Sequence, residues 1–516
     1  MEPMANPEIE RERVVILGSG WAGYTVARRL DPSKYQAVIV SPRSYFAFTP
    51  LLASTSVGTL EYRTAMEPIR SKRLPHVSYI QGWADGVSFA KKTVTVEEAV
   101  NDPRQGVSLT EGPHAGETPR EREAEKSVER RKGELFDLQY DKLVIAVGCY
   151  SQTFGTPGVK EHALFLKDVG DARKIRNRII QCFETAALPT TSEEMRRHLL
   201  NFAIVGGGPT GIEFSAELHD IIAEDMRKIY PELANLCRIT VYDVAPKVLS
   251  MFDEKLGKYA TDMFHREGIA VKTSHHVEGV RRGAPDVNGR APYPMVKDRQ
   301  SCWTLKVQEE GDIGVGMVVW STGLMMNPFV DNALSRVQAF PRMSSIFPTS
   351  REPRSDAAGL QWMVKKHPKT GAVITDDRLR LIIEPASKDG SDIGKGDSAR
   401  AVMDDVFALG DCSTLEGTMY PATAQVASQK AEWLAKRLNK DDIEKKTFTW
   451  KNMGVMAYLG NWKAIMQTSG SSFSGRTAWL IWRGAYLTKS VSVRNKILIP
   501  VYWFLNWAFG RDISRF

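Results

Sequence analysis

The chain has 516 residues, of which 42% are hydrophobic and 25% charged, and its formal net charge is +8. This length and composition predict two or three globular domains, and the basic balance suits anionic partners such as nucleotide phosphates, acidic lipid or nucleic acid. Five cysteines without a C-x-x-C pair argue against a disulfide framework, a metal centre and a thioredoxin-like dithiol.

The first expected elements form a strand–turn–helix–strand unit. A short apolar strand at 13–17 precedes Gly18-Ser-Gly20-Trp-Ala-Gly23, which is followed by a helix at 24–30 and a strand at 37–40. A glycine turn in this position lets the backbone approach a pyrophosphate, and the helix N-terminus attracts its charge. The usual acidic residue is absent after the second strand, so Ser41 and Arg43 are expected to serve the adenosine ribose.

The same pattern recurs further along the chain. A strand at 202–205 leads into Gly206-Gly-Gly208-Pro-Thr-Gly211, then a helix at 212–226 and a strand at 239–242 that ends at Asp243. Two copies predict two dinucleotide sites. A carboxylate at Asp243 accepts hydrogen bonds from ribose hydroxyls and repels a 2′-phosphate, which favours NADH over NADPH.

The first turn is expected to hold FAD, because the apolar strand at 406–409 ends in Gly410-Asp411, a second FAD fingerprint. Two further strands end in glycine, one with Ala146 and Gly148 and the other with Thr322 and Gly323. Such junctions are expected where the chain crosses between an FAD domain and an NADH domain.

These observations predict an α/β protein with two Rossmann-like domains. The expected divisions are 11–165 and 324–440 for the FAD-binding domain, 166–323 for the NADH-binding domain and 445–516 for a C-terminal segment. Two polar stretches, 97–135 and 384–400, are expected to be exposed insertions in the FAD-binding domain.

The C-terminal segment is rich in tryptophan. Six of the twelve tryptophans lie between 450 and 516, four of them in the apolar stretches 478–487 and 497–509. Neither stretch is long enough to cross a bilayer as a straight helix. Tryptophan, basic and aliphatic residues together favour a segment lying in the membrane interface. The alternative is a buried C-terminal helix pair or a homodimer contact.

Several motifs together resemble one family closely. They are Ser41-Pro-Arg-Ser-Tyr-Phe-Ala-Phe-Thr49-Pro-Leu-Leu52, Phe165-Leu-Lys167, Gly206 to Glu213, Trp320-Ser-Thr-Gly323, Ala408-Leu-Gly-Asp411 and Pro421-Ala-Thr-Ala424-Gln425-Val-Ala-Ser-Gln429. The sequence resembles the type II NADH dehydrogenases, which are single-subunit, non-proton-pumping NADH:quinone oxidoreductases. Apart from the two insertions, the matches run from about residue 13 to the C-terminus.

The resemblance implies non-covalent FAD, with Thr49 and Ala424 beside it, NADH stacked on the flavin, and ubiquinone reached from the membrane side. It implies catalytic roles for Gln425 and Gln429 at the quinone and for Glu213 near the nicotinamide, with Lys430 standing where glutamate is common. A peripheral homodimer on the mitochondrial inner membrane is further implied, although no presequence is visible, and no nucleic-acid partner is expected.

Two alternatives stay open. One is a soluble flavoenzyme of the same architecture that reduces oxygen or another acceptor. The other is a flavoprotein for signalling or nucleic-acid binding that uses NADH as a conformational ligand.

Overall fold

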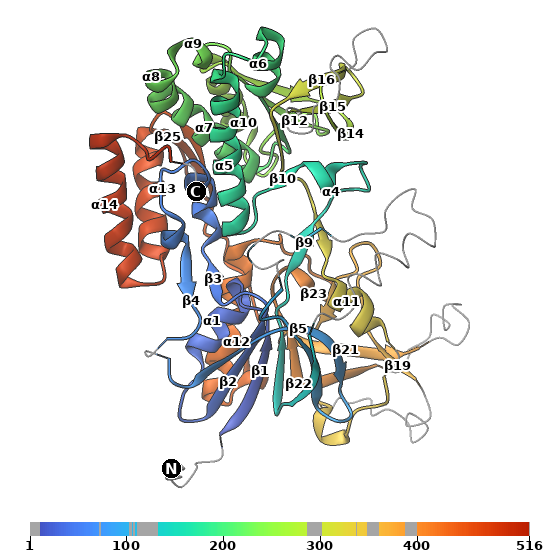
Figure 1. Cartoon of the computed structure of the whole chain (residues 1–516). Coiled ribbons are helices and arrows are strands. Elements are labelled where there is room, and N and C mark those ends of the chain that lie inside the picture. Colours follow the sequence, from blue (N-terminus) through green and yellow to red (C-terminus); the bar gives the residue numbers. More distant parts are fainter. Residues whose placement is uncertain are drawn as a thin grey trace, which may run out of the picture.

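The computed structural model describes residues 11–71, 74–102, 106, 109–110, 133–285, 302–336, 338–347, 361–386 and 400–514. Most of the two polar stretches, 97–135 and 384–400, lies outside the described residues. In the described residues the chain builds one mixed sheet and one parallel sheet, each in its own lobe, and the C-terminal helices pack along one side of both lobes (Figure 1).

The first sheet has five parallel strands at its centre, in the order β22-β8-β1-β2-β5. These strands are β22 (Ala401–Ala408), β8 (Lys142–Ile145), β1 (Glu12–Leu17), β2 (Tyr35–Ser41) and β5 (Val77–Ser88). Leu17 pairs with Val40 on one side and Ile145 on the other, so the carboxyl ends of these strands meet at one edge. The helices α1 (Trp21–Arg29) and α12 (Ala424–Lys440) pack against each other on this sheet.

The second sheet is parallel throughout, in the order β10-β17-β11-β12-β13. Its strands are β10 (Leu164–Phe165), β17 (Met317–Trp320), β11 (Asn201–Val205), β12 (Arg238–Asp243) and β13 (Ile269–Thr273). The helices α5 (Val169–Ala187), α7 (Pro209–Ile221) and α10 (Glu254–Arg266) accompany it. A small antiparallel sheet of β14 (Val277–Arg282), β15 (Trp303–Val307) and β16 (Gly311–Val315) packs nearby.

The expected strands at 13–17, 37–40, 202–205 and 239–242 are confirmed, but both helices begin earlier than expected. Helix α1 begins at Trp21 and α7 at Pro209, so Gly23 and Gly211 lie in the first turn of each helix. The reason is that Gly20 and Gly208 act as the N-caps. The helix expected to end at residue 226 turns π-helical over Ile222–Met226.

The chain crosses between the two sheets at two neighbouring places. After Gly148 it runs through β9 (Cys149–Ser151) into the upper lobe, and after Gly323 it returns through β18 (Leu324–Met326). The two strands pair antiparallel, with Ser151 opposite Leu324. Both expected glycine junctions therefore lie where the chain passes from one sheet to the other.

The C-terminal segment is a three-stranded antiparallel sheet followed by two helices. The elements are β24 (Val455–Gly460), β25 (Lys463–Gln467), β26 (Ser472–Gly475), α13 (Arg476–Lys489) and α14 (Val493–Phe509). Strand β24 packs on α7, and α13 packs on β25. Among the described residues no helix is both long and apolar enough to cross a membrane.

Candidate active site

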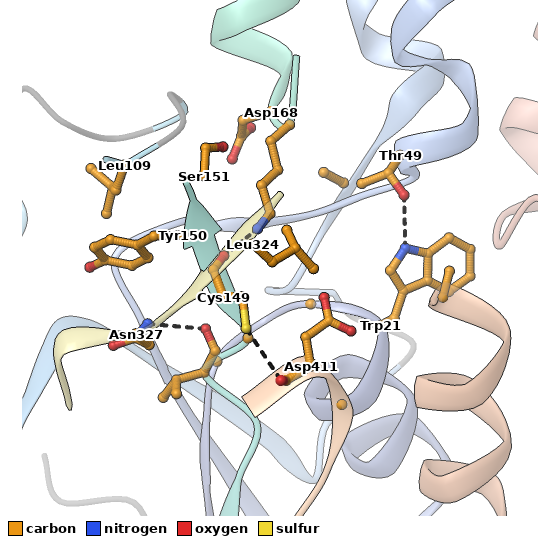
Figure 2. A pocket seen from close by; sticks show the side chains of 18 of the residues that line it. Trp21, Thr49, Leu109, Cys149, Tyr150, Ser151, Asp168, Leu324, Asn327 and Asp411 are labelled. Atoms are coloured by element: carbon orange, nitrogen blue, oxygen red, sulfur yellow. Dashed lines mark hydrogen bonds between the residues drawn. The ribbon is translucent and has the colours of Figure 1, made fainter. Parts of the chain in front are cut away.

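A cavity of about 580 Å³ lies where the carboxyl ends of the first sheet meet the second lobe. Strand ends, both crossing strands and α12 contribute to its lining (Figure 2). Thirteen of the residues expected at the site lie on it: Gly18, Gly20, Ser41, Arg43, Thr49, Ala146, Gly148, Glu213, Thr322, Gly323, Gly410, Asp411 and Ala424.

The glycines of the first turn have different surroundings. A Cβ on Gly18 would lie 2.3 Å from the Ala146 carbonyl oxygen, and one on Gly23 would lie 2.1 Å from the Gly18 oxygen. A Cβ on Gly20, in contrast, would meet nothing within 4 Å. The outer glycines are therefore required by packing, and the middle one leaves space at a helix N-terminus, which is what a pyrophosphate needs.

The second turn repeats this arrangement. A Cβ on Gly211 would lie 2.0 Å from the Gly206 oxygen, whereas one on Gly208 would meet nothing within 4 Å. Gly206, Gly208 and Gly211 are not on the cavity lining, but Pro209 and Thr210 of the same turn are. The second turn thus faces the cavity from the second lobe, whereas the first turn faces it from the first lobe.

Asp243 lies beside the second turn. Its carboxylate accepts hydrogen bonds from the backbone N–H groups of Gly207, at 2.5 Å, and Ala245, at 2.7 Å. These bonds hold the turn in shape. The carboxylate has further lone pairs for ribose hydroxyls, and the ribose contact stays a prediction.

Ser41, Arg43 and Thr49 each have a protein partner. The Ser41 hydroxyl lies 2.9 Å from the Ser19 hydroxyl, and Arg43 pairs with Asp168 at 2.6 Å. Thr49 accepts a hydrogen bond from Trp21 Nε1 at 3.0 Å (Figure 2). These contacts fix polar groups around the first glycine turn.

Two lysines lie near Asp411, which is on the cavity lining. Burial raises the pKa of Asp411, whereas Lys167 and Lys430 act to lower it. Lys430 is only 2% exposed, and burial lowers its pKa to about 8. Lys167 donates a hydrogen bond to the Cys149 carbonyl. Both lysines therefore act to favour the charged form of the Asp411 carboxyl group.

The cysteines of the site are protonated thiols. Burial raises the pKa of Cys149, whose Sγ lies 3.2 Å from the Asp411 carbonyl oxygen (Figure 2). Burial also raises the pKa of Cys412 to about 11. Because the thiolate is the reactive form, neither side chain is an activated nucleophile.

Glu213 lines the cavity from α7 and is 8% exposed. Its Oε1 accepts hydrogen bonds from the backbone N–H of Tyr458, at 3.1 Å, and from Trp482 Nε1, at 3.2 Å. Burial raises its pKa to about 7, although these two hydrogen bonds act in the opposite direction. A carboxyl group with this pKa can take up or release a proton at neutral pH.

Gln425 and Gln429 are away from the cavity lining. Gln425 donates to the Gly454 carbonyl at 3.2 Å and accepts from Trp450 and Met453, whereas Gln429 forms two hydrogen bonds with the backbone of Lys451. Both amides therefore fasten the segment 450–454 to α12. The role expected for them at a quinone stays a prediction.

Three residues that face the site were not expected from the sequence: Tyr458, Trp482 and Tyr486. Tyr486 lines the cavity, and the other two bond Glu213. Trp482 belongs to a stretch that reads as membrane-facing, and it lies 269 residues from its partner. No local sequence pattern predicts a contact over this distance. The one available signal is the spacing of Trp482 and Tyr486, which lie one helical turn apart on α13.

The two glycine turns converging on one cavity define a two-dinucleotide-binding oxidoreductase. A sequence profile of the pyridine nucleotide-disulphide oxidoreductase family matches residues 12–336, and a profile of the NDH2 C-terminal domain matches residues 452–512. The structure of NDH2 from Plasmodium falciparum in complex with NADH has the same fold, with a TM-score of 0.72 at 21% identity, covering 98% of this chain and 100% of the other.

Two relatives narrow the class. A probable NADH dehydrogenase of Dictyostelium discoideum is 36% identical, over 98% of this chain and 92% of its own length. The external alternative NAD(P)H-ubiquinone oxidoreductase B1, mitochondrial, of Solanum tuberosum is 32% identical, over 99% and 91%. The chain belongs to the family of alternative, or type II, NADH dehydrogenases, which confirms the resemblance found in its sequence.

Proposed function

We propose that this protein is a non-proton-pumping NADH:quinone oxidoreductase that holds FAD at its first glycine turn and NADH at its second. The observation that carries the proposal is the pair of turns whose middle glycines, Gly20 and Gly208, leave open space at helix N-termini around one cavity. The named activities of the relatives agree with it.

The residues of the first turn suit FAD. Gly20 would admit the pyrophosphate, Ser41 and Arg43 would face the adenosine ribose, and Asp411 would contact the ribityl and pyrophosphate region. A bound flavin accepts a hydride and passes on two electrons. We propose that the segments 11–165 and 324–440 form this FAD-binding domain.

The residues of the second turn suit NADH. Gly208 would admit its pyrophosphate, Asp243 would accept hydrogen bonds from the adenosine ribose, and Pro209 and Thr210 lead from the turn into the cavity. Asp243 would repel a 2′-phosphate, so NADH is preferred over NADPH. This NADH-binding domain comprises residues 166–323.

Quinone would enter beside α13. Tyr486 supplies an apolar wall there, and Glu213 supplies a carboxyl group that exchanges protons near neutral pH. Because Gln425 and Gln429 bond the segment 450–454, they would shape this approach through that segment.

The C-terminal segment, 445–516, would dock on the membrane. Helix α14 exposes large apolar side chains along one side, with Ile497, Phe504 and Trp507 at least 60% exposed. Such a row suits the interface of a bilayer, and Lys489, Arg494 and Lys496 near the start of α14 suit acidic headgroups. A homodimer contact through the same region and a peripheral place on the mitochondrial inner membrane fit the mitochondrial relatives.

The experiment is NADH oxidation by the purified protein with three acceptors: a short-chain ubiquinone analogue, ferricyanide and oxygen. We expect a yellow protein that reduces the quinone at least about ten times faster than oxygen, because a membrane quinone is its natural acceptor. A colourless protein would disprove the flavin assignment. Oxygen as the faster acceptor would favour the soluble flavoenzyme instead.

A further inference from the structure

One face of α7 and its π-helical extension carries a row of acidic side chains. Glu213, Glu217, Asp220 and Glu224 recur at steps of three and four residues, which places them on one side of the helix. The first three are 8%, 4% and 4% exposed, whereas the Glu224 side chain is 48% exposed. The row therefore runs from the interior to the solvent.

The row also connects two cavities. Glu213 lines the active-site cavity, whereas Glu217, Asp220 and Glu224 line a second cavity of about 490 Å³ under α13 and α14. Five tryptophans also line this second cavity: Trp462, Trp479, Trp482, Trp503 and Trp507. Polar side chains line it as well, among them Ser54, Thr59, Lys228, Arg483 and Arg511. The carboxyl groups of α7 thus extend from one cavity to the other.

Hydroxyl groups donate hydrogen bonds to two of these carboxyl groups. The Tyr458 hydroxyl donates to Asp220 at 2.6 Å, and the Tyr458 backbone N–H donates to Glu213. The hydroxyls of Ser54 and Thr59 donate to the two oxygens of Glu217 at 2.6 and 2.7 Å. A hydroxyl group both donates and accepts hydrogen bonds, so these side chains can take a proton from a carboxyl group or give one to it.

The inner end of the row has a free acceptor. Glu213 Oε1 takes both hydrogen bonds, and Oε2 accepts none from the described part of the chain. This atom belongs to a residue that is more than nine-tenths buried and lines the active-site cavity. It is therefore placed to exchange a proton with a bound substrate.

Quinone reduction requires a proton from water. NADH gives up two electrons and one hydrogen as a hydride, whereas a quinone becomes a hydroquinone by taking two electrons and two protons. We propose that the second proton enters through the cavity under α13 and α14 and passes along Glu224, Asp220 and Glu217 to Glu213, which delivers it to the quinone. Each transfer forms one O–H bond and breaks another. This inference rests on the proposed quinone reductase function.

Cationic side chains lie at the outer end of the row. At its mouth Arg511 pairs with Glu224 and Asp225, at 2.7 Å each, and His219 lies 3.7 Å from Asp220. Burial raises the pKa of Glu217, with Asp220 acting in the same direction and Arg511 against it.

Glu213 faces no cation at close range among the described residues. Glu217 on its own helix raises the pKa of Glu213 further, and Tyr458 of β24 and Trp482 of α13 donate hydrogen bonds to it. The phenol of Tyr486 faces it from α13, and Arg483 of the same helix faces Glu217 and Tyr458. Glu213 can therefore hold a proton near neutral pH and release it when a charged acceptor forms.

The test uses the full-length, flavin-loaded protein with Glu217→Gln, and Asp220→Asn as a second variant. A short-chain ubiquinone analogue takes electrons and protons, whereas ferricyanide takes electrons alone. We expect quinone reduction by Glu217→Gln to fall about tenfold or more at pH 8, and ferricyanide reduction to fall less than about twofold, since general acid–base groups contribute at least this much. Millimolar formate, admitted by the second cavity, should restore part of the quinone rate.

Glu67→Gln is the matched control. Glu67 is also 8% exposed and accepts hydrogen bonds from Ser492, at 3.1 Å, and Asn495, at 2.8 Å, at the start of α14, but it lies off the row. It should leave the ratio of the two activities unchanged. Equal losses with both acceptors, or an unchanged quinone rate in both variants, would overturn the proton passage. A wild-type protein that oxidises NADH with ferricyanide but not with quinone would instead overturn the proposed function.

Discussion

At the scale of single residues, each glycine turn contains two kinds of glycine: those that the packing of the fold requires and one that leaves space for a ligand. At Gly18, Gly23, Gly206 and Gly211 a Cβ atom would lie within 3 Å of backbone or side-chain atoms, so any side chain there must displace structure. Gly20 and Gly208 have open space. Substitutions at the two kinds of glycine can therefore test ligand binding and folding separately.

Gly20→Ala should fold and lose FAD, whereas Gly23→Ala should fail to fold stably. The added methyl group of the first variant projects into the space a pyrophosphate would fill, and that of the second would lie 2.1 Å from the Gly18 carbonyl. Circular dichroism and flavin absorbance measure the two properties. A yellow Gly20→Ala protein with wild-type affinity would contradict the assignment of this turn.

A second residue-scale prediction concerns Glu213 and pH. Burial raises its pKa from 4.5 to about 7 in the folded protein. The stability contributed by the protonated form is therefore fully present below pH 4.5 and is lost as the pH rises through about 7. Between about pH 5 and pH 8 wild-type stability should fall relative to Glu213→Gln, by on the order of 1–3 kcal/mol.

Denaturant unfolding of both proteins at several pH values measures this difference. Glu67→Gln serves again as the control, because it replaces another buried glutamate beside the C-terminal segment. Parallel stability curves for wild type and Glu213→Gln would show that the carboxyl group is ionised throughout, and would refute the raised pKa.

At the scale of elements, the two C-terminal helices have different roles. Helix α13 turns Trp482 inward, where it stacks on Tyr458 with ring centroids 5.4 Å apart and donates to Glu213. Helix α14 leaves its apolar row exposed. Deleting 478–516 would consequently remove Trp482 and Tyr486 from the active site as well as the proposed membrane-docking helix, so substitutions on α14 are the cleaner experiment.

The triple variant Ile497→Ser, Val501→Ser, Phe504→Ser should bind anionic lipid vesicles at least about tenfold more weakly, because each substitution removes apolar surface from the interface. Vesicle sedimentation measures binding, and ferricyanide reduction should remain near the wild-type rate. Serine at Leu188 and Met251, which are 50% and 46% exposed elsewhere, is the control. Unchanged sedimentation of the triple variant would contradict the proposal that α14 docks on the membrane.

At the scale of the whole molecule, the cavity ties distant parts of the chain together. Its lining runs from Leu17 to Tyr486 and includes both sheets, both crossing strands and α13. A ligand that fills it contacts all of them, so its binding energy stabilises the chain as a unit.

Removing the flavin should accordingly lower the unfolding temperature by about 5 °C or more, since a ligand at about 100 times its dissociation constant contributes about 2.7 kcal/mol. Differential scanning calorimetry of the stripped and the reloaded protein measures the shift. An unchanged unfolding temperature would show that the group makes few contacts with the folded chain.

The sequence predicts the fold well where local pattern and tertiary structure coincide. Short apolar strands, glycine turns and strand-to-glycine junctions are all local, and the structure has the strands and the crossings at those places. The π-turn at Ile222–Met226 and the early helix starts depend on packing and capping, which the apolar periodicity does not encode.

The site is predictable only in part, for the same reason. The glycines, Asp411 and Glu213 stand in motifs, whereas Trp482 and Tyr458 reach Glu213 from 269 and 245 residues away. Gln425 and Gln429 stand in a motif too, but their hydrogen bonds to 450–454 depend on a segment whose path the sequence pattern does not give.

The pairing of β9 with β18 has one further consequence. Because Ser151 and Leu324 are partners across these strands, the whole upper lobe begins and ends at adjacent points of the lower one. A lobe attached in this way is an insertion with neighbouring ends, the arrangement that tolerates exchange of one module for another. A chimaera that replaces residues 152–323 with the corresponding lobe of an NADPH-preferring relative therefore needs only two short splices. It offers a route to transplanting coenzyme preference while keeping the first glycine turn and its sheet.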